Sequence, residues 1–141
     1  MTGRARLVAR PLQVALYTAL TGSPAVTALL DGRIYDHVPE PAVHPYLVIG
    51  EAVEEPDNTH TSFGRQADIT LHLWDQVDGF SRPTAIVAAL VELLDHQRDA
   101  LSIVGHRVVS IRFVDVRTLR DSDPRIRHVP VRIRVNTQQE A

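Results

Sequence analysis

The chain has 141 residues, of which 17 are acidic and 15 are basic, and a formal net charge of -2. This length suits one domain, which buries ~68% of the surface of its unfolded chain. Cysteine is absent, which excludes disulfides and thiolate metal sites, and no apolar run of ~18 residues or signal-like segment indicates membrane spanning or secretion. We expect a single domain over residues 1–141 that folds in the cytoplasm, with flexible ends at residues 1–10 and 137–141.

Two helices are predicted at the start of the chain. After Pro11, Leu12, Leu16 and Leu20 form an apolar stripe, and Gly22 is a typical helix end. Ser23-Pro24 then provides a cap and a first helical residue, so a second, short helix is expected up to Gly32.

Residues 33–50 contain two short β-rich runs separated by a loop that carries Pro39, Pro41 and Pro45. Each proline fixes φ, removes a backbone donor and pushes the preceding residue into an extended conformation. The loop is therefore expected to be preset, rigid and outside the core, which suits a docking surface.

The segment 54–66 is polar and rich in turn-forming residues, so we expect a long loop there. Such a loop either lies against a neighbouring subunit or points into a lumen, or it is only a mobile hairpin tip. Residues 67–75 then alternate between apolar and polar side chains, which predicts a half-buried antiparallel strand.

A third helix is predicted from about Ser81, since apolar residues recur on one face as far as Leu94. Alternation around 109–113 and 129–135 predicts two more strands, and Pro130 places the last one at a sheet edge or makes it begin after this residue. The expected fold is α+β, in the order α-α-β-β-β-α-β-β, with an antiparallel or mixed sheet of four to five strands and helices packed on one face.

No constellation for catalysis, cofactor binding or metal binding is recognisable, and we expect a protein that is not an enzyme and needs no cofactor. Asp36-His37 and Asp95-His96 are adjacent acid–base pairs, but consecutive strand residues point to opposite faces. His72, beside Trp74, is interpreted as a solvated or interface histidine.

Charge is unevenly distributed along the chain. Residues 31–57 hold seven carboxylates and one arginine, whereas residues 101–135 hold eight arginines and three aspartates. These regions are either ordinary solvated surfaces or complementary patches that join neighbouring copies head to tail. Likewise, the charged segment 120–128 predicts either a subunit interface or a local salt-bridged hairpin.

Four short blocks occur in sequence: Ile34-Tyr35-Asp36-His37-Val38-Pro39, Pro45-Tyr46-Leu47-Val48-Ile49-Gly50, Leu71-His72-Leu73-Trp74 before an aliphatic helix, and Leu119-Arg120-Asp121 before Arg127-His128. In this order and spacing they resemble the tail-completion family of long-tailed bacteriophages and gene transfer agents, the tail-terminator or head–tail joining proteins. The resemblance covers about residues 11–135, and it departs from the family at Val129-Pro130, where the family continues an uninterrupted strand.

The resemblance implies a structural virion protein that forms a ring, expected to be a hexamer, at the head-proximal end of the tail tube. Such a ring ends tube polymerisation and joins the tail to the head-side connector. Its partners would be other copies of itself, the tail-tube protein and the connector, with DNA passing through the lumen without sequence-specific binding and no contact with a membrane. The alternatives are an arginine-rich nucleic-acid-binding module and a small hydrolase that uses Asp36 and His37. The candidate interface residues are Asp36, His37, Pro39, Pro45, Glu54, Glu55, Arg120, Arg127, His128, Arg132 and Arg134.

Overall fold

The computed structural model describes residues 3–140. In chain order the elements are α1 (Ala9–Thr21), α2 (Pro24–Leu30), β1 (Ile34–Tyr35), β2 (Tyr46–Pro56), β3 (Gly64–Gln76), α3 (Ser81–Leu94), the 3-10 helix η1 (Arg98–Ala100), β4 (His106–Val116), β5 (Leu119–Arg120) and β6 (Ile126–Gln139).

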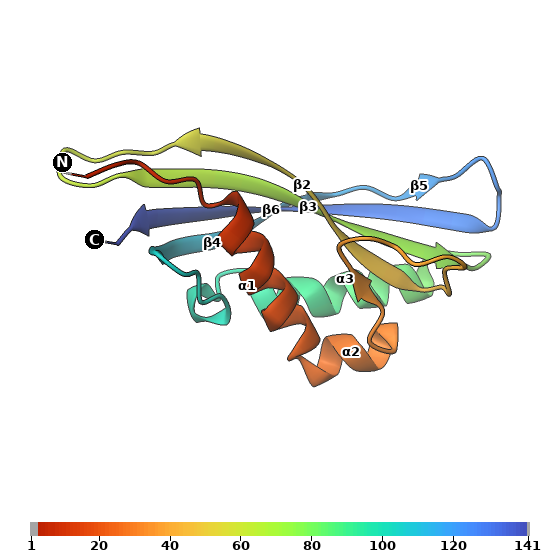
Figure 1. Ribbon diagram of the computed structural model, residues 1–141. Coiled ribbons are helices and arrows are strands. Elements are labelled where there is room, and N and C mark those ends of the chain that lie inside the picture. The colour runs from red at the N-terminus through yellow and green to blue at the C-terminus, as the bar shows by residue number, and fades with distance from the viewer. Residues whose placement is uncertain (1–2, 141) are drawn as a thin grey trace.

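The strands form one mixed sheet of six strands in the order β1-β2-β3-β6-β4, with β5 paired to β6. Only the β1–β2 pair is parallel. The three α-helices lie on one face of the sheet, and the long strands extend beyond them at both ends (Figure 1). The predicted α+β class, the helix positions and their placement on one face are confirmed, while the short strand β5 and η1 were not predicted.

Alternation along the strands places the core between the sheet and the helices. In β3, Ala67, Ile69, Leu71 and Leu73 are buried, at 0 to 2% exposure, because every second strand residue points to the same face. They join the apolar stripe of α1 and the inner side of α3 in one cluster of buried side chains. Burial of this aliphatic surface is the main stabilising contribution to the fold.

The prediction for the last strand is wrong. β6 begins at Ile126, before Pro130, and lies between β3 and β4 in the sheet. The carbonyl of Pro130 accepts a hydrogen bond from the Arg117 amide at 3.1 Å. The backbone polar groups of Pro130 therefore point toward the segment between β4 and β5, where the strand is interrupted between Val116 and Leu119. A residue without an N–H is tolerated there because no regular ladder position needs its donor.

The loop predicted for residues 54–66 is shorter in the structure. β2 continues to Pro56 and β3 begins at Gly64, so only residues 57–63 connect the two strands. The Asp57 amide donates to the Gly64 carbonyl at 2.8 Å, which closes the hairpin. A polar sequence concealed these strand ends, because the hairpin extends past the helices and has little apolar surface to bury.

Residues near both ends of the described chain make specific contacts, and the flexible ends expected for 1–10 and 137–141 stay a prediction. The amides of Val8 and Ala9 donate to the Glu54 carboxylate at 2.9 and 3.1 Å, which supplies the cap that α1 lacks locally. The Arg6 amide donates to the Gln139 side chain at 2.8 Å, and β6 runs to Gln139. Residues 1–2 and 141 lie outside the described residues.

Candidate assembly surface

The sheet face opposite the helices is polar. Asp68, Thr70, His72 and Trp74 of β3 point to this side, and in β6 the residues paired with them are Arg134, Arg132, Pro130 and His128. We call this side of the sheet the open face. Its composition follows from the same alternation that builds the core, since the inner positions of these strands are aliphatic.

At one end of the open face, His72 joins two other polar groups. Its Nδ1 lies 2.7 Å from Nε2 of His128, and its Nε2 lies 2.9 Å from the Glu51 carboxylate. The carboxylate accepts, so His72 donates from Nε2, and its Nδ1 then accepts from His128; this arrangement needs no charge on either ring. The Trp74 ring stacks on His128 with centroids 3.9 Å apart.

The environment of these groups shifts their protonation. The pKa of His128 is lowered. Burial away from water is the largest cause, and the neighbouring His72 is the second. The hydrogen bond from His72 is the main cause that lowers the pKa of Glu51. Both shifts favour an ionised Glu51 and a neutral His128 near pH 7.

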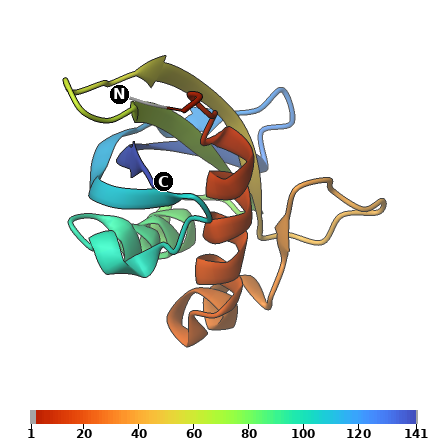
Figure 2. The same ribbon diagram turned by 60° about the vertical axis from the view of Figure 1, so that its left-hand side comes forward.

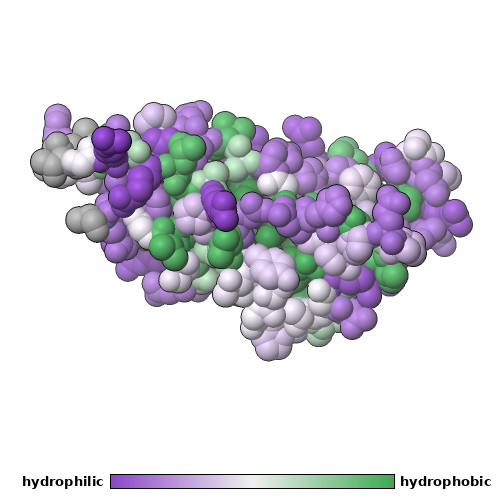
Figure 3. Space-filling view, in the orientation of Figure 1, coloured by the Kyte–Doolittle hydropathy of each residue, from purple (hydrophilic) through white to green (hydrophobic). Residues whose placement is uncertain are grey.

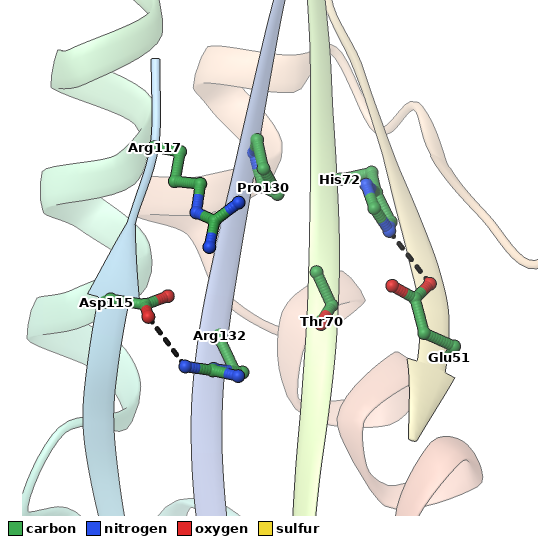
Figure 4. Close-up of a pocket in the computed structure, with 7 residues that line it drawn as sticks. All are labelled: Glu51, Thr70, His72, Asp115, Arg117, Pro130 and Arg132. Carbon is green, nitrogen blue, oxygen red and sulfur yellow. Dashed lines mark hydrogen bonds and ion pairs between the residues drawn. The ribbon is translucent and has the colours of Figure 1, made fainter. Parts of the chain in front are cut away.

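Beside this cluster the open face contains a shallow pocket of about 270 Å³. The ion-paired Arg132 and Asp115 lie on one side of it, and the hydrogen-bonded His72 and Glu51 lie on the other (Figure 4). The pocket is lined by Glu51, Thr70, His72, Asp115, Arg117, Pro130 and Arg132. Cations and carboxylates alternate around it, which suits a polar protein surface better than an apolar ligand.

Two of the candidate interface arginines are paired within their own chain. Arg134 donates to both carboxylate oxygens of Asp68 at 2.8 and 3.1 Å, and Arg132 donates to Asp115 at 2.7 Å. The Arg134 guanidinium lowers the pKa of Asp68. These intramolecular pairs leave less free positive charge on the open face than the sequence suggests.

Two further candidates, Arg127 and Glu54, have buried side chains. The Arg127 side chain is 3% exposed, and its guanidinium donates to the carbonyls of Pro124 and Asp78 and lies 5.1 Å from the Phe80 ring centroid. Glu54 pairs with Arg65 at 2.6 Å while it caps α1. Both therefore stabilise the subunit itself, and their assignment to an interface stays a prediction.

The proline loop, residues 36–45, projects from the body of the molecule (Figure 2). Asp36, His37 and Pro39 are exposed on it, whereas Pro45 is buried at its base. Arg33 holds this base, since its Nε donates to the Pro45 carbonyl at 2.8 Å. The docking role predicted for the loop therefore concerns its exposed part and not Pro45.

The remaining candidates, Glu55 in β2 and Arg120 in β5, are exposed. His128 is half-buried in the cluster with His72. Glu51 and Trp74 were missed as members of this cluster, because only the β3–β6 register brings residues 72, 74 and 128 together and only the β2–β3 pairing brings Glu51 beside His72. Alternation in both strands was readable from the sequence, but the pairing of the strands was not.

The acid–base dyad proposed for a hydrolase does not form among the described residues. Asp36 accepts a hydrogen bond from the Gln13 side chain at 2.7 Å, and no hydrogen bond joins it to His37 in residues 3–140. In the same part of the chain, no three His, Asp or Glu side chains are placed to hold a metal ion. The helices described are also too short or too polar to cross a membrane.

Comparison with protein families decides the identity. The model of the tail completion protein gp17 family matches residues 14–138, which include nearly the whole sheet, α2, α3 and most of α1. The chain belongs to this family. It is a structural component of the virion tail, as the resemblance implied.

A solved structure supports the fold independently. A chain from the virion of a native gene transfer agent particle superposes with a TM-score of 0.86 at 23% sequence identity, and the match covers 95% of this chain and 99% of the other. At this identity the likeness establishes the fold alone. A comparison with curated proteins found no match.

Proposed function

We propose that the protein forms a ring of six copies at the head-proximal end of the tail tube, where it ends tube polymerisation and joins the tail to the head-side connector. The observation that carries the proposal is the family match over residues 14–138. The mechanism is geometric: one side of the ring fits the last ring of tube subunits, and the other side does not reproduce that surface, so growth stops.

The shape of the subunit fits such a role. The proline loop and the β5 turn lie toward one end of the long sheet, while the β2–β3 hairpin and both termini lie at the other (Figure 1). A ring of subunits with a common orientation would present two chemically different sides. We propose that one side contacts the tail-tube protein and the other the connector.

DNA would pass through the lumen without sequence-specific binding. The alternative of a nucleic-acid-binding module is disfavoured because Arg132 and Arg134, central on the open face, are already paired with carboxylates. Binding that rests on the remaining arginines would be weak and strongly salt-dependent.

Removal of the gene from a producing strain tests the function. We expect heads and tails that remain unjoined and tails of irregular length, seen by negative-stain electron microscopy and restored by the parent gene. Normal joined particles in the deletion strain would refute the proposal. Purified protein, alone or with tube ends, should show rings by native mass spectrometry and electron microscopy.

The double variant Pro39→Ala/Pro41→Ala tests the proline loop within this function. Both residues are exposed, so thermal unfolding of the subunit should change little. Ordering a flexible loop costs ~1 to 2 kcal/mol per backbone residue, so we expect fewer joined particles. A yield equal to that of the parent would mean that the loop only connects β1 and β2.

A further inference from the structure

The edge of the sheet formed by β2 has no strand partner over most of its length. β1 pairs only with Leu47 and Val48, and among residues 3–140 no strand covers β2 from Ile49 to Pro56 on that side. Val53, in this segment, is 62% exposed. A free edge with an exposed apolar residue is a surface to which another strand can add.

The opposite edge of the sheet, β4, is covered at its first residue and in its middle. The His96 amide donates to the Ile111 carbonyl at 2.9 Å, and the Asp95 carboxylate accepts from the Phe113 amide at 2.8 Å. These contacts occupy the backbone of residues 111–113. The His106 amide, at the start of β4, donates to the Ile103 carbonyl at 3.1 Å. Residues 107–110, with Arg107 exposed and Val109 40% exposed, have no such cover among the described residues.

The two edges carry opposite charge. Glu51 and Glu55 lie on β2, and Arg107 and Arg112 on β4. Glu55, Arg107 and Arg112 form no ion pair with any residue from 3 to 140. The apolar patches on the face that Figure 3 shows are small and separated by hydrophilic residues, so that face presents no large apolar area for association.

We propose that the free edge of β2 in one copy pairs with the first part of β4 in the next copy, and that this joint closes the ring. The inference rests on the proposed ring function and names the surface that builds it. It uses two different patches of one chain, which is the head-to-tail contact that a ring requires.

The geometry of the sheet favours one register. β2 and β4 run antiparallel within the subunit, because three antiparallel pairings separate them, so copies with a common orientation about the ring axis bring them together antiparallel. In an antiparallel register with Glu55 opposite Arg107, Val53 lies opposite the β-bulge that β4 forms at Val109, between Val108 and Ser110. Both charged residues pair with open-face positions of their own sheet, Gln66 and Gln138, so they meet on the same side.

Crosslinking tests the joint directly, because the chain has no native cysteine. In the variant Val53→Cys/Val109→Cys the two sites lie three strand spacings apart, roughly 14 Å, too far for a bond within one chain. Oxidation of assembled rings should therefore give a ladder of covalent multimers up to the ring size on non-reducing gels. Each single variant should stop at dimers. The matched control Val43→Cys/Val104→Cys, with more exposed sites at 58 and 84%, should give no ladder.

The outcomes separate the two proposals. Intact rings that give no more crosslinking than the control overturn the edge joint and leave the proposed function standing. Parent protein that never assembles, even with tube ends, overturns both. A ladder from assembled rings supports the joint.

Charge exchange gives a second, independent measurement. Glu55→Arg should reduce assembly by about fivefold at low salt, the size of an exposed ion pair, and so should Arg107→Glu. The combined exchange should restore assembly. Glu92→Arg, the same change on an exposed position of α3, is the matched control. Equal effects of Glu55→Arg and Glu92→Arg, or no restoration in the double variant, contradict the register.

Discussion

The two faces of the sheet come from the same strands and have opposite roles. On the helix-covered face, Ile69, Leu71 and Leu73 are at most 2% exposed, whereas on the open face Thr70 and His72 remain partly accessible. The covered face stabilises the subunit by removing apolar area from water. The open face holds hydrogen bonds and ion pairs, which contribute less to stability. Substitutions one residue apart should therefore differ strongly.

The largest effect is expected on the covered face. Leu71→Ala removes a fully buried side chain and should lower the free energy of unfolding by about 2 to 5 kcal/mol, from lost burial and the cavity left behind. Thr70→Ala, on the open face, is the matched control and should change it by less than about 0.5 kcal/mol. Urea denaturation of both variants measures the difference, and similar losses would contradict the division between the faces.

A smaller effect should come from the one carboxylate buried on the covered side of β3. Asp75 is 0% exposed and accepts a hydrogen bond from Nε of Arg82 at 2.8 Å. Arg82→Gln leaves this buried carboxylate without its charged donor and should cost roughly 1 to 3 kcal/mol. Arg98→Gln, which removes an exposed arginine without an ion pair in the described chain, is the control and should be near neutral. If both variants unfold at the same urea concentration, the Asp75–Arg82 pair contributes nothing.

The smallest effect concerns the open face and depends on pH. Burial lowers the pKa of His128 in the folded protein, while a histidine in the unfolded chain has a pKa of about 6.5. Its contribution to stability is therefore fully present above that value and is lost as the pH falls through the lower, folded pKa. An NMR titration of the His128 ring should give a midpoint below that of the unfolded chain.

The variant His128→Phe keeps a ring that can stack on Trp74 but cannot be protonated. It should lose less stability than the parent between pH 7 and pH 5, measured by thermal unfolding. His106, whose pKa is also lowered by burial, remains in both proteins and adds the same slope. An unchanged slope in the variant would show that the histidine cluster on the open face does not respond to pH in this range.

Several parts of the fold were readable from the residues alone. The apolar faces of α1 and α3 and the alternation of β3 have the periods of their elements, because burial of one face selects side chains at every helical turn or every second strand position. The errors fell where a distant contact overrides the local pattern. Pro130 is tolerated inside the sheet since the neighbouring chain is interrupted between Val116 and Leu119, and β2 and β3 extend into residues predicted as a loop because they pair with each other there.

The candidate interface was less predictable than the fold. Exposed Glu55 and Arg120 could be assigned to a surface from their charge, but Glu54, one residue away, points inward to cap α1 and pair with Arg65. Arg127 was named as a candidate interface residue, and its side chain is buried and donates to the carbonyls of Pro124 and Asp78. Charge alone does not tell which of these roles a residue has.

The sequence by itself determined the α+β class, the order of the main elements and the family, since these depend on local periodicity and on short blocks in a set order. Only the tertiary structure decided which residues share a face and which edges stay open. Strand order and register are set by contacts between segments that are far apart in the chain, such as β3 with β6, and a one-residue shift would exchange the two faces of a strand. The pairing of Arg132 and Arg134 with carboxylates, the His72–His128 contact and the unpaired edge of β2 all follow from that register.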